Sequence, residues 1–67
     1  MEAITVMQLI DIIGNLRVQL FDADSGILLA DGRKASKKIK IFHSHLVEYI
    51  DFKPGRVRAR IYKEVSR

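Results

Sequence analysis

LVEYIDFKPGRVRARIYK, residues 46–63, constrains the architecture more than any other stretch, because it predicts a β-hairpin with a defined turn. Two β-rich runs flank Lys53-Pro54-Gly55-Arg56, with proline at turn position i+1 and glycine at i+2. Counting back from this turn predicts one face, the core side, with the pairs Phe52 and Val57, Ile50 and Ala59, Glu48 and Ile61. The opposite face is predicted to carry the pairs Asp51 and Arg58, Tyr49 and Arg60, Val47 and Tyr62.

The N-terminal segment predicts an amphipathic helix over residues 6–13. Thr5 has the character of an N-cap, Gln8 completes a capping box, and Gly14 provides the stop. The apolar stripe is broad, since the side chains that widen it are Met7 and Ile12. We expect such a helix to be covered on more than one side, by a later segment or by a second copy of the chain.

A second hairpin is predicted after this helix. Residues 16–21 alternate in polarity like a strand, residues 22–26 form the loop, and residues 27–30 return as the next strand. Residues 33–45 fit two patterns: a short helical turn capped by Ser36, or a short strand around Ile39 and Ile41. We favour a short helix or turn, followed by irregular chain through His43-Ser44-His45.

These elements predict a single α+β domain over residues 1–67. One N-terminal helix packs on a four-stranded, mainly antiparallel sheet built from two hairpins, which makes a two-layer sandwich. Absence of cysteine favours a cytoplasmic location. The longest apolar stretch, residues 4–13, is about half the length of a bilayer span, so we expect no membrane association.

Charge is distributed unequally along the chain. Residues 1–32 hold one base and five acids, a net charge of −4, whereas residues 33–67 hold eleven bases and three acids, a net charge of +8. A cationic surface concentrates anions, including nucleic acid, acidic protein and anionic lipid. The asymmetry is therefore a clue to a partner.

The best candidate site is the predicted outer side of the last hairpin. Three arginines stand at alternate positions about 6.6 Å apart, a spacing of the same order as that of phosphates along one nucleic-acid strand. The residues that we assign to a nucleic-acid site are Arg56, Arg58, Arg60, Tyr62, Tyr49, Lys37, Lys38 and Lys40. The alternative is a solvated sheet face, in which Asp51 pairs with Arg58 and Arg60 lies over Tyr49.

Neither a metal site nor an active site is predicted. His43 and His45 could begin a zinc site, but no third ligand lies nearby in the sequence, and Asp22, Asp24 and Gly26 fit a turn better than a calcium loop. No phosphate-binding loop or nucleophile motif occurs. We expect no enzyme activity, no cofactor and no small-molecule substrate.

The stretches TVMQLIDIIG, VQLFDADSGILLADG and VEYIDFKPGRVRARIY together resemble small uncharacterised proteins of phages and integrative mobile elements of gut Firmicutes. The resemblance lies in element order and hairpin style, and implies no functional residue. We expect a non-enzymatic binding or regulatory protein, with nucleic acid preferred as its partner. The alternative is a protein-interaction module, such as a regulator or accessory factor of a mobile element, acting as a homodimer.

Overall fold

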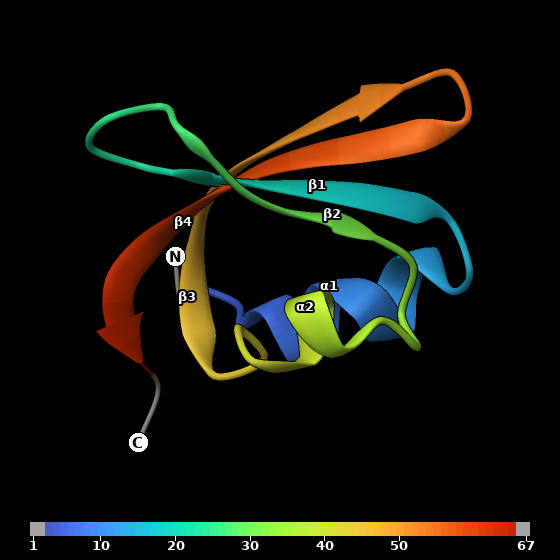
Figure 1. Cartoon of the computed structure of the whole chain (residues 1–67), viewed down its shortest axis with the longest axis horizontal. Coiled ribbons are helices and arrows are strands. Elements are labelled where there is room, and N and C mark those ends of the chain that lie inside the picture. Colours follow the sequence, from blue (N-terminus) through green and yellow to red (C-terminus); the bar gives the residue numbers. More distant parts are fainter. Residues whose placement is uncertain (1–2, 66–67) are drawn as a thin grey trace.

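The computed structural model describes residues 3–65, in which both helices lie on one face of a four-stranded sheet (Figure 1). This arrangement confirms the predicted α+β class. The elements are α1 (Val6–Ile13), β1 (Arg17–Asp22), β2 (Leu28–Gly32), α2 (Lys37–Lys40), β3 (His45–Lys53) and β4 (Arg56–Val65).

The two hairpins, β1 with β2 and β3 with β4, are joined into one sheet by the pairing of β1 with β4. The sheet order is β2-β1-β4-β3, and the central pair β1 and β4 is parallel, with Arg17 opposite Arg56 and Phe21 opposite Arg60. The other two pairings, β1 with β2 and β3 with β4, are antiparallel. The chain therefore has to pass from one sheet edge to the other between β2 and β3, and α2 lies on that crossing.

The start of α1 matches its sequence signature. The Gln8 amide N donates to Thr5 Oγ1 at 3.2 Å, while the Thr5 amide N donates to Gln8 Oε1 at 2.8 Å, which confirms the capping box. At the other end, Gly14 takes a φ of 66° and its N–H donates to the Ile10 carbonyl at 2.8 Å. A positive φ favours glycine, so the helix ends where predicted.

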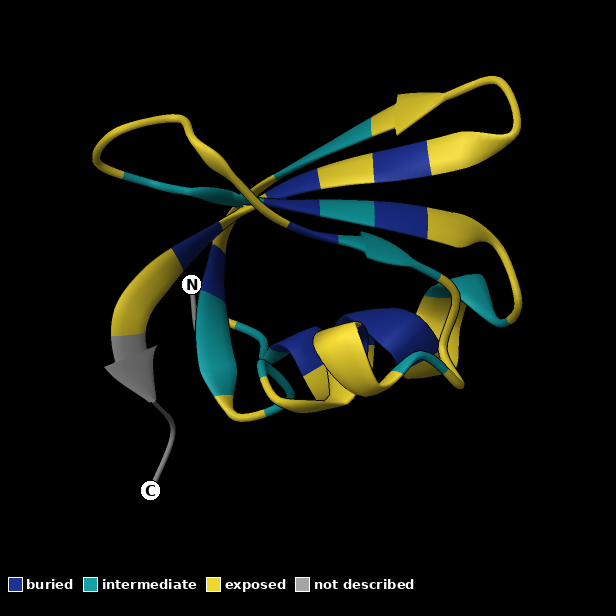
Figure 2. Ribbon diagram, viewed as in Figure 1, coloured by how far each residue is buried: buried dark blue, intermediate teal, exposed yellow. Residues whose placement is uncertain are grey.

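One hydrophobic core lies between the sheet and the helices (Figure 2). Its buried members come from both helices and all four strands: Val6, Leu9, Ile10, Val18, Leu20, Ala30, Ile39, Val47, Val57, Ala59 and Ile61. We call α1 and α2 together the helix layer. The other side of the sheet carries no helix within residues 3–65, and we call it the outer face (Figure 1).

The short helix α2 is anchored to the core by a single side chain. Ile39 is fully buried, whereas its neighbours Lys38 and Lys40 are exposed. The chain that leads into α2 passes very close to β2, because a Cβ on Gly32 would lie 2.9 Å from the Ser36 Cβ. The preference for a short helix in this region is confirmed, although β3 already begins at His45, within the stretch predicted to be irregular.

A bulge in β3 overturns part of the predicted register. Pairing follows the prediction from Phe52 opposite Val57 to Tyr49 opposite Arg60, but Val47 is then opposite Ile61. The extra residue changes which side chain faces the core. Val47 is buried and Glu48 is exposed, the reverse of the prediction.

The tip of the last hairpin lies outside the core. Phe52 stands on the helix side of the sheet with Val57, as predicted, yet it is 65% exposed. The twisted hairpin carries its turn away from the helix layer (Figure 1), so no helix covers Phe52.

Candidate functional site

The outer face brings together side chains from three neighbouring strands. Since β-strand side chains alternate, the buried Val57 and Ala59 direct their neighbours Arg56, Arg58 and Arg60 to the outer face. We call these three the arginine row. By the strand register, the row is flanked on the β1 side by Arg17, Gln19 and Phe21, and on the β3 side by Tyr49, Asp51 and Lys53.

Two carboxylates of the described part of this face, Asp31 and Asp51, are already paired, and neither is paired with the arginine row. Arg17 donates from Nε to Asp31 Oδ1 at 2.7 Å and from Nη2 to Asp31 Oδ2 at 2.6 Å. Asp51 Oδ2 lies 3.3 Å from Lys53 Nζ. Within residues 3–63, whose side chains the structure describes, no carboxylate forms an ion pair with the arginine row. The register places Asp51 opposite Arg58, as predicted, but the ion pair that the alternative of a solvated sheet face assigned to them is replaced by the pair of Asp51 with Lys53.

The Arg17 and Asp31 pair has a clear electrostatic effect. The hydrogen bond from Arg17 lowers the pKa of the Asp31 carboxyl, against a smaller opposing effect of desolvation, and the Gln19 amide contributes in the same direction as Arg17. The same bond raises the pKa of Arg17. Asp31 therefore stays ionised, and a planar two-bond contact fixes it to its partner.

Arg58 lies over an aromatic ring that the sequence prediction did not include. Its guanidinium carbon is 4.8 Å from the ring centroid of Phe21, a cation–π distance. The alternative of a solvated sheet face had placed Arg60 over Tyr49 instead. Phe21 was missed because its contact depends on the parallel pairing of β1 with β4, and the alternation of Arg17, Gln19 and Phe21 was the signal that could have found it.

A small hollow opens beside this contact, and we call it the outer-face hollow. It has a volume of about 130 Å³ and is lined by Phe21, Gly26, Tyr49, Asp51, Arg58, Ala59 and Arg60. Two arginines, two aromatic rings and one carboxylate thus meet around a space smaller than a usual small-molecule pocket.

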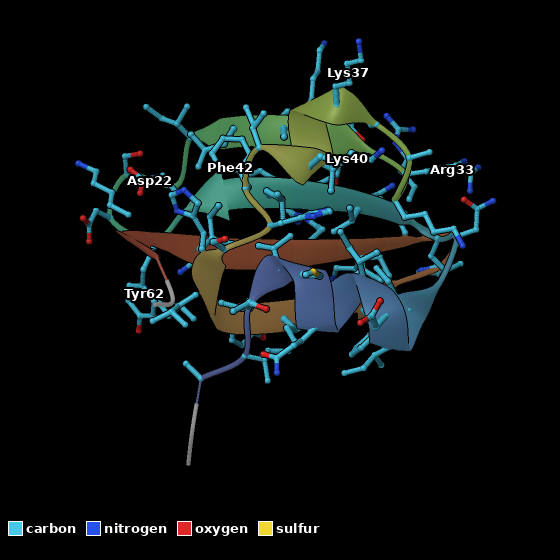
Figure 3. The ribbon with its side chains drawn as sticks, turned by 90° about the horizontal axis from the view of Figure 1, so that it is seen from below. Asp22, Arg33, Lys37, Lys40, Phe42 and Tyr62 are labelled. Atoms are coloured by element: carbon cyan, nitrogen blue, oxygen red, sulfur yellow. The ribbon has the colours of Figure 1, made fainter. Side chains whose placement is uncertain are left out.

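The two tyrosines of the predicted site are not equivalent. Tyr49 lines the outer-face hollow, whereas Tyr62 does not. Beyond the β3 bulge, Tyr62 lines two other hollows, one of about 440 Å³ with Ile4 and Val47 and one of about 200 Å³ with Phe42. Figure 3 places Tyr62 at the end of the molecule opposite Arg33. The predicted pairing of Tyr62 with Val47 is wrong, and only Tyr49 joins the arginine row.

The lysines of the predicted site lie on the other layer. Lys37, Lys38 and Lys40 belong to α2, whose Ile39 enters the core from the helix side of the sheet. Figure 3, which views the helix layer, shows Lys37 and Lys40 around α2. The arginine row points to the opposite side of the sheet, so the three lysines assigned to the same site do not lie beside it.

The two histidines make separate contacts. His45 Nδ1 donates to the Tyr62 carbonyl at 2.8 Å, and its ring meets that of Phe42 edge-on at a centroid distance of 5.3 Å. His43 Nε2 is buried and has no hydrogen-bond partner among the described residues. Among the described residues, no three His, Cys, Asp or Glu side chains are grouped so that they could hold a metal ion.

The Asp22 loop has the hydrogen bonds of a turn. Ser25 Oγ donates to Asp22 Oδ2 at 2.8 Å, and the Ile27 amide N donates to Ser25 Oγ at 3.2 Å. The Ser25 bond is the main reason that the pKa of Asp22 is lowered. Gly26 closes the loop with a φ of 75°, a conformation that glycine adopts without strain.

No protein-family model, curated protein sequence or solved structure matches the chain. The resemblance to phage and mobile-element proteins thus stays a prediction. Across residues 3–65, no helix has the length and apolarity needed to cross a bilayer.

Proposed function

We propose that the protein binds single-stranded nucleic acid on the outer face of its sheet. The observation that carries this proposal is the arginine row, Arg56, Arg58 and Arg60, lying beside Phe21 and Tyr49 on a sheet face that no helix covers. Single-strand binders combine a cationic surface for the backbone with flat groups on which bases stack. This face supplies both.

The charge pattern of the face supports a phosphate backbone as the ligand. Asp31 and Asp51 are engaged by Arg17 and Lys53, so the arginine row keeps its charge for an incoming anion. Successive arginines stand about 6.6 Å apart along β4. A strand laid along β4 would therefore meet a guanidinium at regular intervals.

The contact of Arg58 with Phe21 favours single-stranded nucleic acid, rather than a duplex, as the ligand. The Arg58 guanidinium lies over Phe21, and bases stack on arginine planes as well as on aromatic rings. A duplex keeps its bases stacked on one another, so it would use only the charges of this face. The protein is expected in the cytoplasm, and that location stays a prediction.

The test is fluorescence anisotropy with a labelled single-stranded oligonucleotide at roughly 50 mM salt, where phosphate contacts are strong. We expect the logarithm of the binding constant to fall linearly with the logarithm of the salt concentration. The slope should be about −2 for three neutralised phosphates. R56Q/R60Q should weaken binding at least tenfold, while the matched pair K37Q/K38Q, which removes the same charge from α2, should change it little. No binding at high micromolar protein, or equal losses in the two variants, would contradict the proposal.

A second candidate function, self-association, is favoured by the exposed apolar side chains of the helix layer. Met7 is 48% exposed and Ile12 is 71% exposed, although both belong to the apolar stripe of α1. A second copy of the chain would cover them in a homodimer that leaves the outer face free. Light scattering should show a dimer that M7K/I12K dissociates and that I27K, a change at an equally exposed loop position, leaves intact. A strict monomer at high micromolar concentration would refute this candidate.

A further inference from the structure

The outer-face hollow contains a carboxylate that a phosphate site would not be expected to hold. Asp51 lines the hollow together with Arg58 and Arg60, and its side chain is 35% exposed. A carboxylate repels phosphate but accepts hydrogen bonds from N–H groups. This chemistry suits the edge of a base, with the phosphates left to the arginine row.

Neighbouring contacts leave Asp51 able to accept further hydrogen bonds. Its cross-strand partner Arg58 lies over Phe21 and forms no ion pair with Asp51. The contact with Lys53 joins Asp51 Oδ2 to Nζ at 3.3 Å. A carboxylate offers about four acceptor sites, so most of the acceptor capacity of Asp51 is available to a ligand.

The lining of the hollow also sets the size and shape of what can enter. Its volume of about 130 Å³ is too small for a usual small-molecule ligand, but a space lined by aromatic and guanidinium groups suits the edge of a single base. The ring of Phe21, over which Arg58 lies, forms part of the wall of the hollow, and Tyr49 contributes a second aromatic ring. A base that enters between such groups would meet Asp51 with its hydrogen-bonding edge.

We propose that Asp51 makes the outer face prefer guanine, by accepting hydrogen bonds from the guanine N1–H and N2–H groups. Guanine is the base that presents two adjacent N–H donors on its Watson–Crick edge, which match the two oxygens of one carboxylate. Thymine presents one donor between two carbonyl oxygens, which the carboxylate would repel. This inference rests on the proposed single-strand binding, and it adds a base specificity to it.

The test compares three oligonucleotides of eleven residues: all thymidine, thymidine with one central guanosine, and thymidine with one central inosine. A single guanosine avoids the four-stranded structures that guanine runs form, and inosine lacks only the N2 amino group. We expect the guanosine strand to bind about tenfold more tightly than the thymidine strand, within the range of a bidentate base contact. The inosine strand should lose most of that advantage.

Two asparagine variants separate a specific role from a charge effect. D51N should abolish the preference for guanosine without lowering affinity for the thymidine strand. D31N removes the same charge from the same face but outside the hollow, and should keep the preference. Equal binding of guanosine and thymidine strands by the native chain, or a preference that survives D51N, would overturn the inference.

The outcomes also distinguish this inference from the proposed function. If all three strands bind equally and R56Q/R60Q weakens them, single-strand binding stands and the guanine site is refuted. If no strand binds, both are refuted, unless guanosine monophosphate alone binds and D51N abolishes that binding. That last result would support the guanine site with a free nucleotide as its ligand and would refute the binding of a strand.

Discussion

The outer face and the helix layer both carry basic side chains, but in different surroundings. The arginine row stands at regular strand spacing beside aromatic rings, and the carboxylates near it are paired with other bases. The lysines of α2 surround one buried anchor, Ile39, and share their layer with the exposed Met7 and Ile12. The comparison shows that a count of charges locates no site, since the order and the neighbours of the charges determine what they can bind.

The largest effect is expected when the anchor of α2 in the core is removed. I39A should lower the free energy of unfolding by about 2–5 kcal/mol, because it deletes a fully buried side chain from the core. The matched control is I41A, two residues on, where the side chain is 72% exposed and the loss should stay within about 0.5 kcal/mol. Urea unfolding measures both. Equal losses would mean that α2 is not anchored through Ile39.

A smaller effect is expected where the helix layer meets the sheet edge. G32A would place a Cβ 2.9 Å from the Ser36 Cβ and 3.0 Å from its Oγ, so the chain leading into α2 has to shift. We expect a loss of about 1–3 kcal/mol, as for an overpacked site. Thermal unfolding measures it, and G32A/S36G, which removes the contacted side chain, should recover part of the loss. Full stability of G32A alone would contradict the close approach.

The smallest effect belongs to the outer face and depends on pH. Because Arg17 lowers the pKa of Asp31, the pair contributes stability above the carboxyl pKa of the unfolded chain, about 3.9, and loses it as the pH falls through the lower folded pKa. For an exposed pair the contribution is small, because solvent screens the charges. Urea unfolding from pH 7 to pH 2 should show a smaller acid-induced loss in D31N than in the native chain. Identical pH profiles would show that the pair adds no stability.

Local sequence signals predicted the elements well. The capping box of Thr5 and Gln8, the positive φ of Gly14 and the turn at Pro54 and Gly55 involve residues only a few positions apart, and all appear in the structure. The burial of Val47 and the exposure of Glu48, the reverse of the predicted arrangement, could not be predicted in the same way. A bulge is placed by what packs on the sheet, and period-two counting cannot detect it.

The candidate site was only partly predictable, because its parts come from distant segments. Arg56, Arg58, Arg60 and Tyr49 share one hairpin, so their common face followed from alternation alone. Phe21 joins them through a pairing of strands far apart in the chain, and the lysines of α2 separate from them because the chain crosses the sheet on its helix side. Those two placements depend on topology, which no local pattern contains.

The parallel pairing of β1 with β4 has a consequence for the order of folding. Arg17 and Arg56, which lie opposite each other, are 39 positions apart in the chain, whereas each hairpin closes over a short loop. Distant contacts incur a larger loop-closure entropy and form more slowly. On a ribosome, the centre of the sheet could not be completed before the last strand emerged. We expect V18A, at the central pair, mainly to accelerate unfolding in stopped-flow measurements, and changes in the Pro54-Gly55 turn mainly to slow folding.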